Sequence, residues 1–220
     1  MIRVLLPFFI LVLLSACSFK SKPDAWKYKS INAFSSYTNN FLSDRDALAK
    51  GDLKRAIHHA KQSANLNQLS RIYLGKCALN ISVGIEDKCL EYQDIESLLE
   101  DKELDSYYKL ISTSLKPQDI KTLDSTYKNF AQSVLASNYT QAKKELFDMD
   151  VITSKLLSAS LIKERLNFAE VERLIDDASF YGYKKSVLFW LNVLQEKTTS
   201  EDKLREIDKK LRVLGSLTGV

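Results

Sequence analysis

Glycine and proline are scarce in this chain, with six glycines and three prolines in 220 residues, whereas glycine alone averages about 7% of an ordinary protein. Tight hairpin turns need these residues and helices do not, so the composition favours an all-α fold. The formal net charge is only +4, spread over 32 basic and 28 acidic residues. Such a balance is typical of a solvated surface, and we expect no nucleic-acid partner.

The N-terminal stretch carries the most specific signal in the chain. One arginine precedes an apolar run over residues 4–14, and two small residues then lead into Cys17. The run is too short for a spanning helix and has the layout of a secretory signal. Leu14-Ser15-Ala16-Cys17 resembles the lipobox of bacterial lipoproteins, in which the cysteine thiol receives a diacylglyceryl group and the chain is cut just before it. The resemblance implies a signal peptide over residues 1–16 and lipidation of Cys17, which would attach the chain to a membrane. An ordinary signal or an uncleaved anchor is the alternative.

Residues 17–30 are polar and rich in lysine, with no apolar periodicity, and we expect them to form a lipidated tether. Its four lysines, Trp26 and Tyr28 either contact lipid headgroups or belong to an ordinary soluble linker. In enterobacterial lipoproteins, an aspartate after the lipidated cysteine holds the protein at the inner membrane. Ser18 stands at that place here, so the resemblance favours the outer membrane, facing the periplasm, over the inner membrane.

Two further cysteines, Cys77 and Cys89, remain in a domain expected to be exported, where disulfides form and persist. We predict that they are bonded to each other, with two buried thiols as the alternative. Both fall close to a predicted turn over residues 82–85, on the core-facing sides of the two flanking helices. A disulfide there would hold that helix hairpin closed.

Apolar residues recur at helical spacing from Ile31 onward, which predicts an all-helical, repeat-like domain over residues 31–220. The first helix is expected to carry Phe34, Tyr37, Phe41 and Leu48 on one stripe and to end near Lys50-Gly51, with Asp52 capping the next helix. Later helices are expected to include Phe168 to Phe180, and a buried helix around the apolar run Val187 to Leu191. No stretch predicts a β-strand.

Two predicted helix–turn–helix joints carry small residues at the same offsets. The first consists of Ala47, Gly51, Leu53, Ala56 and Ala60, and the second of Ser133, Ser137, Tyr139, Ala142 and Leu146. Both resemble the bend of the tetratricopeptide repeat (TPR), although they stand 86 residues apart, which is no multiple of that family's 34-residue period. The resemblance implies antiparallel helix pairs stacked as a TPR-like α-solenoid. A non-repetitive helical bundle is the alternative.

No spacing of residues predicts a cofactor, a metal site or a catalytic group. The only histidines, His58 and His59, are adjacent and point about 100° apart on a helix, so they cannot share a metal ion as an i, i+4 pair would. Ile95-Glu96-Ser97 is similar to the glutamate–serine pair of lytic transglycosylases, in which the glutamate is general acid and base. The downstream Gly-Leu-Met-Gln and Ala-Tyr-Asn motifs of those enzymes do not occur here. We therefore expect no enzyme, with murein cleavage through Glu96 as the alternative.

The expected function follows from the anchor and the architecture together. Stacked helix pairs leave a concave surface that suits an extended peptide or a partner helix. We expect a lipid-anchored periplasmic protein that binds another protein, as a scaffold or accessory subunit of an envelope complex. A surface-exposed adhesin is a further alternative, which protease treatment of intact cells distinguishes from the periplasmic protein.

Overall fold

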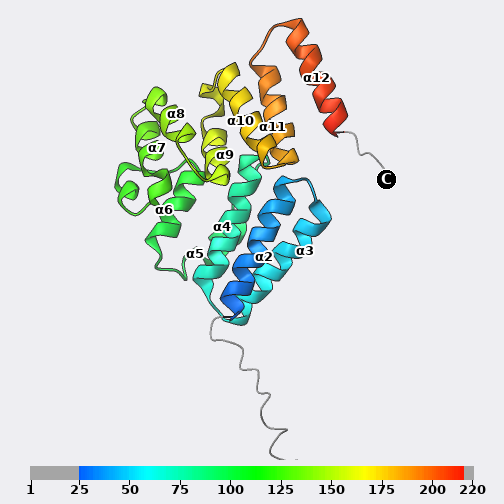
Figure 1. Ribbon diagram of the computed structural model, residues 1–220. Helices are drawn as coiled ribbons and strands as arrows, with labels where there is room; N and C mark the ends of the chain where they lie inside the picture. The colour runs from blue at the N-terminus through cyan, green and yellow to red at the C-terminus, as the bar shows by residue number, and fades with distance from the viewer. Residues whose placement is uncertain (1–24, 216–220) are drawn as a thin grey trace, which may run out of the picture.

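The computed structural model describes residues 25–215, and outside their turns and connecting loops these residues are helical. They form eleven α-helices and two short 3-10 helices, with no strand among them (Figure 1). The all-α fold that the scarcity of glycine and proline predicts is therefore confirmed. Cys17, the predicted signal peptide over residues 1–16 and residues 17–24 of the predicted tether lie outside the described residues.

The N-terminal part of the fold begins with three long helices that pack on one another. In chain order its helices are α2 (Ala25–Leu42), α3 (Asp46–Gln62), α4 (Leu66–Ser82), α5 (Leu90–Glu96) and α6 (Lys102–Ile111). Helices α2 and α3 form an antiparallel hairpin, and α4 packs against both. Small residues allow this close approach, since Ala33, Ala56 and Ala60 are buried beside Leu69 and Ile72.

The C-terminal part continues the stack with successive helix pairs. Its elements are η1 (Pro117–Lys121), α7 (Ser125–Leu135), α8 (Tyr139–Phe147), α9 (Ile152–Leu161), η2 (Lys163–Arg165), α10 (Phe168–Phe180), α11 (Lys184–Glu196) and α12 (Glu201–Gly215). Neighbours along the chain pack on each other, as α7 does with α8 and α10 with α11. Helix α9 joins the two parts, because it packs against α4 as well as against α7 and α8 (Figure 1). The fold is a stack of adjacent helix pairs, as expected of a helical-repeat solenoid.

The turn between α10 and α11 returns to the turn between α2 and α3. The Tyr183 hydroxyl donates a hydrogen bond to Asn39 Oδ1 at 3.2 Å, and Lys185 Nζ lies 4.5 Å from the centre of the Phe41 ring. Lys184 forms an ion pair with Asp44 at 3.4 Å. These contacts link the C-terminal helix pairs to the N-terminal hairpin.

The predicted tether over residues 17–30 is wrong for its last six residues, because α2 begins at Ala25. Ser30 is completely buried, and its hydroxyl donates a hydrogen bond to the carbonyl of Ala56 at 3.1 Å. A helix that buries a serine and alanines against its neighbour shows little apolar periodicity. The helical domain therefore extends N-terminally at least to Ala25.

The first predicted joint is also wrong, because Gly51 lies inside α3 and the preceding helix ends at Leu42. The chain turns at Asp44, whose φ is 64°, where two backbone bonds close a Schellman cap: Asp44 N–H to Phe41 O at 3.1 Å and Arg45 N–H to Asn40 O at 2.8 Å. Asp52 is buried inside α3 and accepts a hydrogen bond from Asn40 Nδ2 at 2.7 Å, so it does not cap a helix. The second joint is a true turn, with Ser137 between α7 and α8.

The same cap explains how the chain turns with so few glycines. Schellman pairs of backbone hydrogen bonds close five helices, and their left-handed residues are Asp44, Gly84, Thr113, Ser137 and Gly182. A residue other than glycine in this conformation costs about 1 kcal/mol. Three of the five turns carry that strain, so glycine content underestimates the number of turns in this chain.

Candidate functional site

A disulfide fixes the loop between α4 and α5. The structure joins Cys77, near the end of α4, to Cys89, with 5.4 Å between their Cα atoms, and both residues are buried. This is the pairing predicted from the sequence, but its surroundings differ from the prediction. Cys89 is not on a helix face, because it precedes α5 in a left-handed conformation with φ at 54°. The bond therefore ties the connecting loop to α4, and it does not staple two helix faces together.

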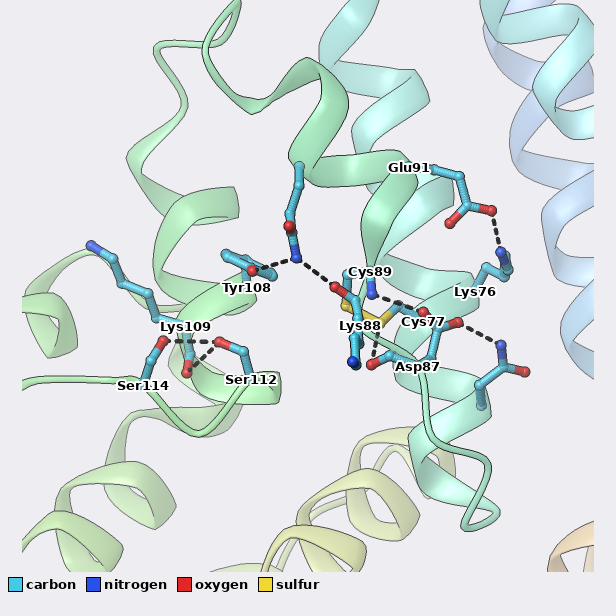
Figure 2. The surroundings of a disulfide bond; sticks show 12 residues. Lys76, Cys77, Asp87, Lys88, Cys89, Glu91, Tyr108, Lys109, Ser112 and Ser114 are labelled. Carbon is cyan, nitrogen blue, oxygen red and sulfur yellow. Dashed lines mark hydrogen bonds and ion pairs between the residues drawn. A yellow bond between two sulfur atoms is a disulfide. The ribbon is translucent and has the colours of Figure 1, made fainter.

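Hydrogen bonds hold the rest of this loop in place (Figure 2). Asp87 accepts the backbone N–H of Cys89 at 2.8 Å on one carboxylate oxygen and Asn80 Nδ2 at 2.7 Å on the other. Gln93 Nε2 donates to the carbonyl of Lys88 at 2.6 Å and to the hydroxyl of Tyr108 at 2.8 Å. The loop is thereby connected to α4, α5 and α6, which gives it a defined shape beside the disulfide.

A groove of about 700 Å³ lies next to this loop. Its walls come from the end of α4, the loop, α5, the ends of α6 and α9, η2 and one side chain of α11. The apolar side chains that line it are Ile81, Ile85, Ile111, Leu161 and Phe189. The charged and polar lining includes Glu86, Asp87, Lys88, Gln93, Tyr108 and Lys163. The groove thus combines an apolar lining with charged groups of both signs.

Gly84 sets the position of Phe189 in this groove. Its φ is 75°, and a Cβ atom at this position would meet the Phe189 ring, lying 2.6 Å from its Cδ2 atom. Only glycine combines this backbone conformation with this close approach. The glycine at the end of α4 therefore allows the aromatic ring of α11 to cover the turn.

The loop leaves backbone donors free beside the groove. Residues 85–89 are not helical, and the backbone N–H groups of Glu86, Asp87 and Lys88 have no hydrogen-bond partner within residues 25–215. Backbone N–H groups that lack a partner in the protein are available to hydrogen-bond a ligand. The groove and the free donors together form a surface suited to peptide recognition.

A second groove, of about 730 Å³, contains Glu96. Glu96 stands at the last position of α5, and the groove is also lined by Glu100, Asp101 and Asp105. The neighbouring Tyr92 is buried against Tyr108, with 5.0 Å between the ring centres. Burial, with the Glu96 carboxylate nearby, raises the pKa of Tyr92 well above its usual value of 10. The Tyr92 phenol therefore stays protonated even in alkaline solution, and its ring packs against Tyr108.

The remaining chemical candidates from the sequence do not come together. His58 and His59 lie on α3 with 5.5 Å between their ring centres, and His59 Nδ1 is 3.0 Å from Gln62 Oε1. Across residues 25–215, Cys77, Asp87 and Cys89 form the single group of three metal-ligand types whose atoms lie within 4.8 Å of one another. Both sulfur atoms of that group are bonded to each other, and a structural zinc site takes four ligands.

Sequence reasoning identified the disulfide pair and missed the groove beside it. The lining residues come from stretches that are distant in sequence, 81–93, 108–113 and 160–163, together with Phe189. Most of their apolar members follow the same helical spacing as core residues. Gly84 was a usable signal, because a glycine directly after a predicted helix marks a left-handed position.

Comparison with known proteins identified no relative of this chain. Searches of family models, curated proteins and solved structures found no match to this chain. In the described part of the chain, no helix has the length and apolar character needed to cross a bilayer.

Proposed function

We propose that this chain is a lipoprotein anchored to an envelope membrane through Cys17, and that its helical domain binds another protein in the periplasm. The lipobox-like Leu14-Ser15-Ala16-Cys17 supports the anchor. The pairing of Cys77 with Cys89 supports an oxidising compartment, because disulfides are rare in the cytosol. The proposed role is that of a scaffold or accessory subunit of an envelope complex.

The observation that carries the binding role is the groove beside the disulfide. Its loop is held rigid by a covalent bond and side-chain hydrogen bonds, so little conformational entropy is lost when a partner binds. Free backbone donors at Glu86 to Lys88 supply hydrogen bonds, and the apolar lining supplies burial. The proposed ligand is an extended peptide segment of a partner protein, with apolar side chains that enter the groove.

Metabolic labelling with a fatty acid tests the anchor. The full-length protein is expected to incorporate the label and to fractionate with membranes, while Cys17→Ala loses both properties. Cys77→Ser/Cys89→Ser is the matched control, because it removes the other two cysteines and keeps the lipobox. An unlabelled wild-type protein would refute the anchor.

Substitution in the groove tests the binding role. Ile85 is 45% exposed and lies outside the helices, so Ile85→Arg places a charge in the groove without disturbing the core. Leu48→Arg is the matched control, at a position on α3 that is 58% exposed. Partners captured after crosslinking in cells are expected to disappear with Ile85→Arg and to persist with Leu48→Arg. Equal recovery from both variants would refute the groove as the binding site.

The competing function is murein cleavage. It is supported by the position of Glu96, which lines a groove together with other carboxylates. Glu96→Gln removes the only proton donor that the lytic transglycosylase resemblance offers. Our proposal predicts that purified wild-type protein and Glu96→Gln release equal, background amounts of glycan from isolated murein. Release by wild-type protein alone would establish the enzyme instead.

A further inference from the structure

Charge is divided unevenly between the two parts of the fold. Helices α2 to α4 and their turns, residues 25–82, contain nine lysines and arginines and three acidic residues, whereas residues 83–220 contain 20 basic and 24 acidic residues. The three acids are Asp44, Asp46 and Asp52, and all of them lie at or near the α2–α3 turn. The opposite end of this three-helix unit therefore carries lysines and none of the acidic residues of residues 25–82. Of the acids on other elements, Asp101 and Glu103 reach the unit at Arg71 of α4, with which both form ion pairs.

That end is formed by the first turns of α2 and the last turn of α3. Ser30 is hydrogen-bonded to Ala56 in the antiparallel hairpin, and five further residues along α3 bring Lys61 level with the start of α2. Figure 1 shows the beginning of α2 and the α3–α4 connection at the same end of the molecule. We define the basic end as Lys27, Tyr28, Lys29, Ile31 and Lys61.

The basic end is open to solvent and mixes charged with apolar groups. Its three lysines are exposed, and none of them forms an ion pair within the described part of the chain. Tyr28 is 70% exposed and Ile31 is 48% exposed, and these two residues lie three positions apart, on one face of α2. Lysines beside exposed aromatic and aliphatic side chains are typical of surfaces that rest on lipid headgroups.

The chain length to the proposed anchor brings this end close to the bilayer. Eight residues, 17–24, connect Cys17 to the first residue of α2. Even fully extended, they span at most about 27 Å. The start of α2 is therefore the part of the domain that lipidation would hold nearest to the membrane.

We propose that the basic end docks on the surface of an anionic phospholipid bilayer. The proposal rests on lipidation of Cys17, which supplies the attachment, and it adds an orientation. Lys27, Lys29 and Lys61 contact the phosphate groups, and Tyr28 and Ile31 enter the interface. Because α4 starts at this end and has 17 residues, the groove at its far end is held about 25 Å from the bilayer. Docking thus presents the groove to a partner in the periplasm.

Tryptophan fluorescence in vesicles measures this docking directly. Trp26 lies in the first turn of α2 and Trp190 is completely buried in the core, so quenching by brominated acyl chains reports on Trp26. The full-length lipidated protein is reconstituted in vesicles of brominated phosphatidylcholine, with or without phosphatidylglycerol as the anionic lipid. We expect at least about twofold more quenching with the anionic lipid at low salt, and a return to the neutral level at high salt. Trp26→Phe supplies the contribution of Trp190.

Charge reversal tests whether the lysines of the basic end contact the anionic lipid. Each lysine near an anionic surface is worth about a fivefold change in affinity, so Lys27→Glu/Lys29→Glu/Lys61→Glu is expected to weaken docking by on the order of a hundredfold or more. The matched control, Lys121→Glu/Lys144→Glu/Lys209→Glu, changes the net charge equally at exposed positions elsewhere and is expected to dock normally. Equal quenching in neutral and anionic vesicles, or equal loss in the two variants, would overturn the proposal.

Vesicle flotation distinguishes failure of docking from failure of the lipid anchor. A lipidated chain floats with neutral vesicles whether or not its basic end docks. A protein that does not float with neutral vesicles would refute the anchor, and a protein that floats but shows no lipid-dependent quenching would refute docking alone.

Discussion

Gly84→Ala is expected to lower the free energy of unfolding by about 2–4 kcal/mol. The left-handed conformation, with φ at 75°, costs an alanine about 1 kcal/mol. The new Cβ atom would also meet the Phe189 ring at less than contact distance, and overpacking of this kind costs roughly 1–3 kcal/mol. In a chain of this size the sum corresponds to a decrease in melting temperature of roughly 4–16 °C.

Gly182→Ala is the matched control for this experiment. Gly182 has a similar φ of 68°, but a Cβ atom there has no neighbour within 4 Å. This variant is expected to lower the free energy of unfolding only by the cost of the left-handed conformation, about 1 kcal/mol. The difference between the two variants, measured by urea unfolding followed by far-UV circular dichroism, isolates the contact with Phe189.

A double-mutant cycle completes the test. Phe189→Ala removes the ring, so Gly84→Ala is expected to cost no more than Gly182→Ala in that background. Equal losses for Gly84→Ala and Gly182→Ala in the wild-type background would refute the packing of Phe189 on the α4 turn. The wall that this ring contributes to the groove would then also be in doubt.

Three further outcomes are expected, each from a different kind of interaction. Cys77→Ser should lower the free energy of unfolding by about 3 kcal/mol in a chain-entropy estimate, and alkylation of the unfolded, unreduced wild-type protein should leave both bonded cysteines unmodified; labelling of both would refute the disulfide. Thr113→Gly should raise stability by roughly 1 kcal/mol in urea unfolding, because Thr113 has a φ of 57° at a helix end; a loss would contradict the assigned cap. The hydrogen bond from Lys109 lowers the pKa of Asp119, so its contribution to stability is complete above the unfolded pKa and is lost as the pH falls through the lower folded pKa. Asp119→Asn should therefore flatten the decline of melting temperature below about pH 4, and an unchanged decline would exclude this carboxylate as a cause.

Much of the fold was predictable from sequence because helix-forming patterns are local. The predicted helix from Phe168 to Phe180 has the same bounds in the structure, where Asn167 and Glu170 form a capping box. Val187, Trp190 and Leu191, in the run predicted to be a buried helix, are indeed buried. Such segments combine an apolar stripe with a clear start or stop signal.

The errors arose where the helix boundary depends on a non-glycine turn. The stripe through Phe34, Tyr37 and Phe41 predicts a helix that continues to Leu48, but the cap at Asp44 ends the helix at Leu42. Leu48 therefore belongs to the next helix, α3, which begins at Asp46, and it is 58% exposed. Gly51 was the reason for placing the turn there. A glycine inside a helix lowers helix stability by only about 1 kcal/mol, so Gly51 does not end α3.

The groove could not be predicted from sequence because it is a tertiary feature. Ile85 comes from a loop, Ile111 from the end of α6 and Phe189 from α11, and only the packing of α4 on α9 and of the later pairs brings them together. The cysteine pair was predictable because, once Cys17 is assigned to the proposed lipid anchor, the two remaining cysteines allow one pairing. The loop that the disulfide holds, and the groove beside that loop, are seen only in the structure.

Binding of a partner in the groove is tested most directly by photocrosslinking in intact cells. A photoreactive amino acid is placed at Ile85 of the full-length protein, and the adducts are identified by mass spectrometry. We predict one abundant protein adduct that is lost with Cys17→Ala and absent when the same photoreactive residue stands at Leu48. Adducts of equal yield and identity from both positions, or none from Ile85, would contradict a membrane-anchored scaffold that binds its partner in the groove.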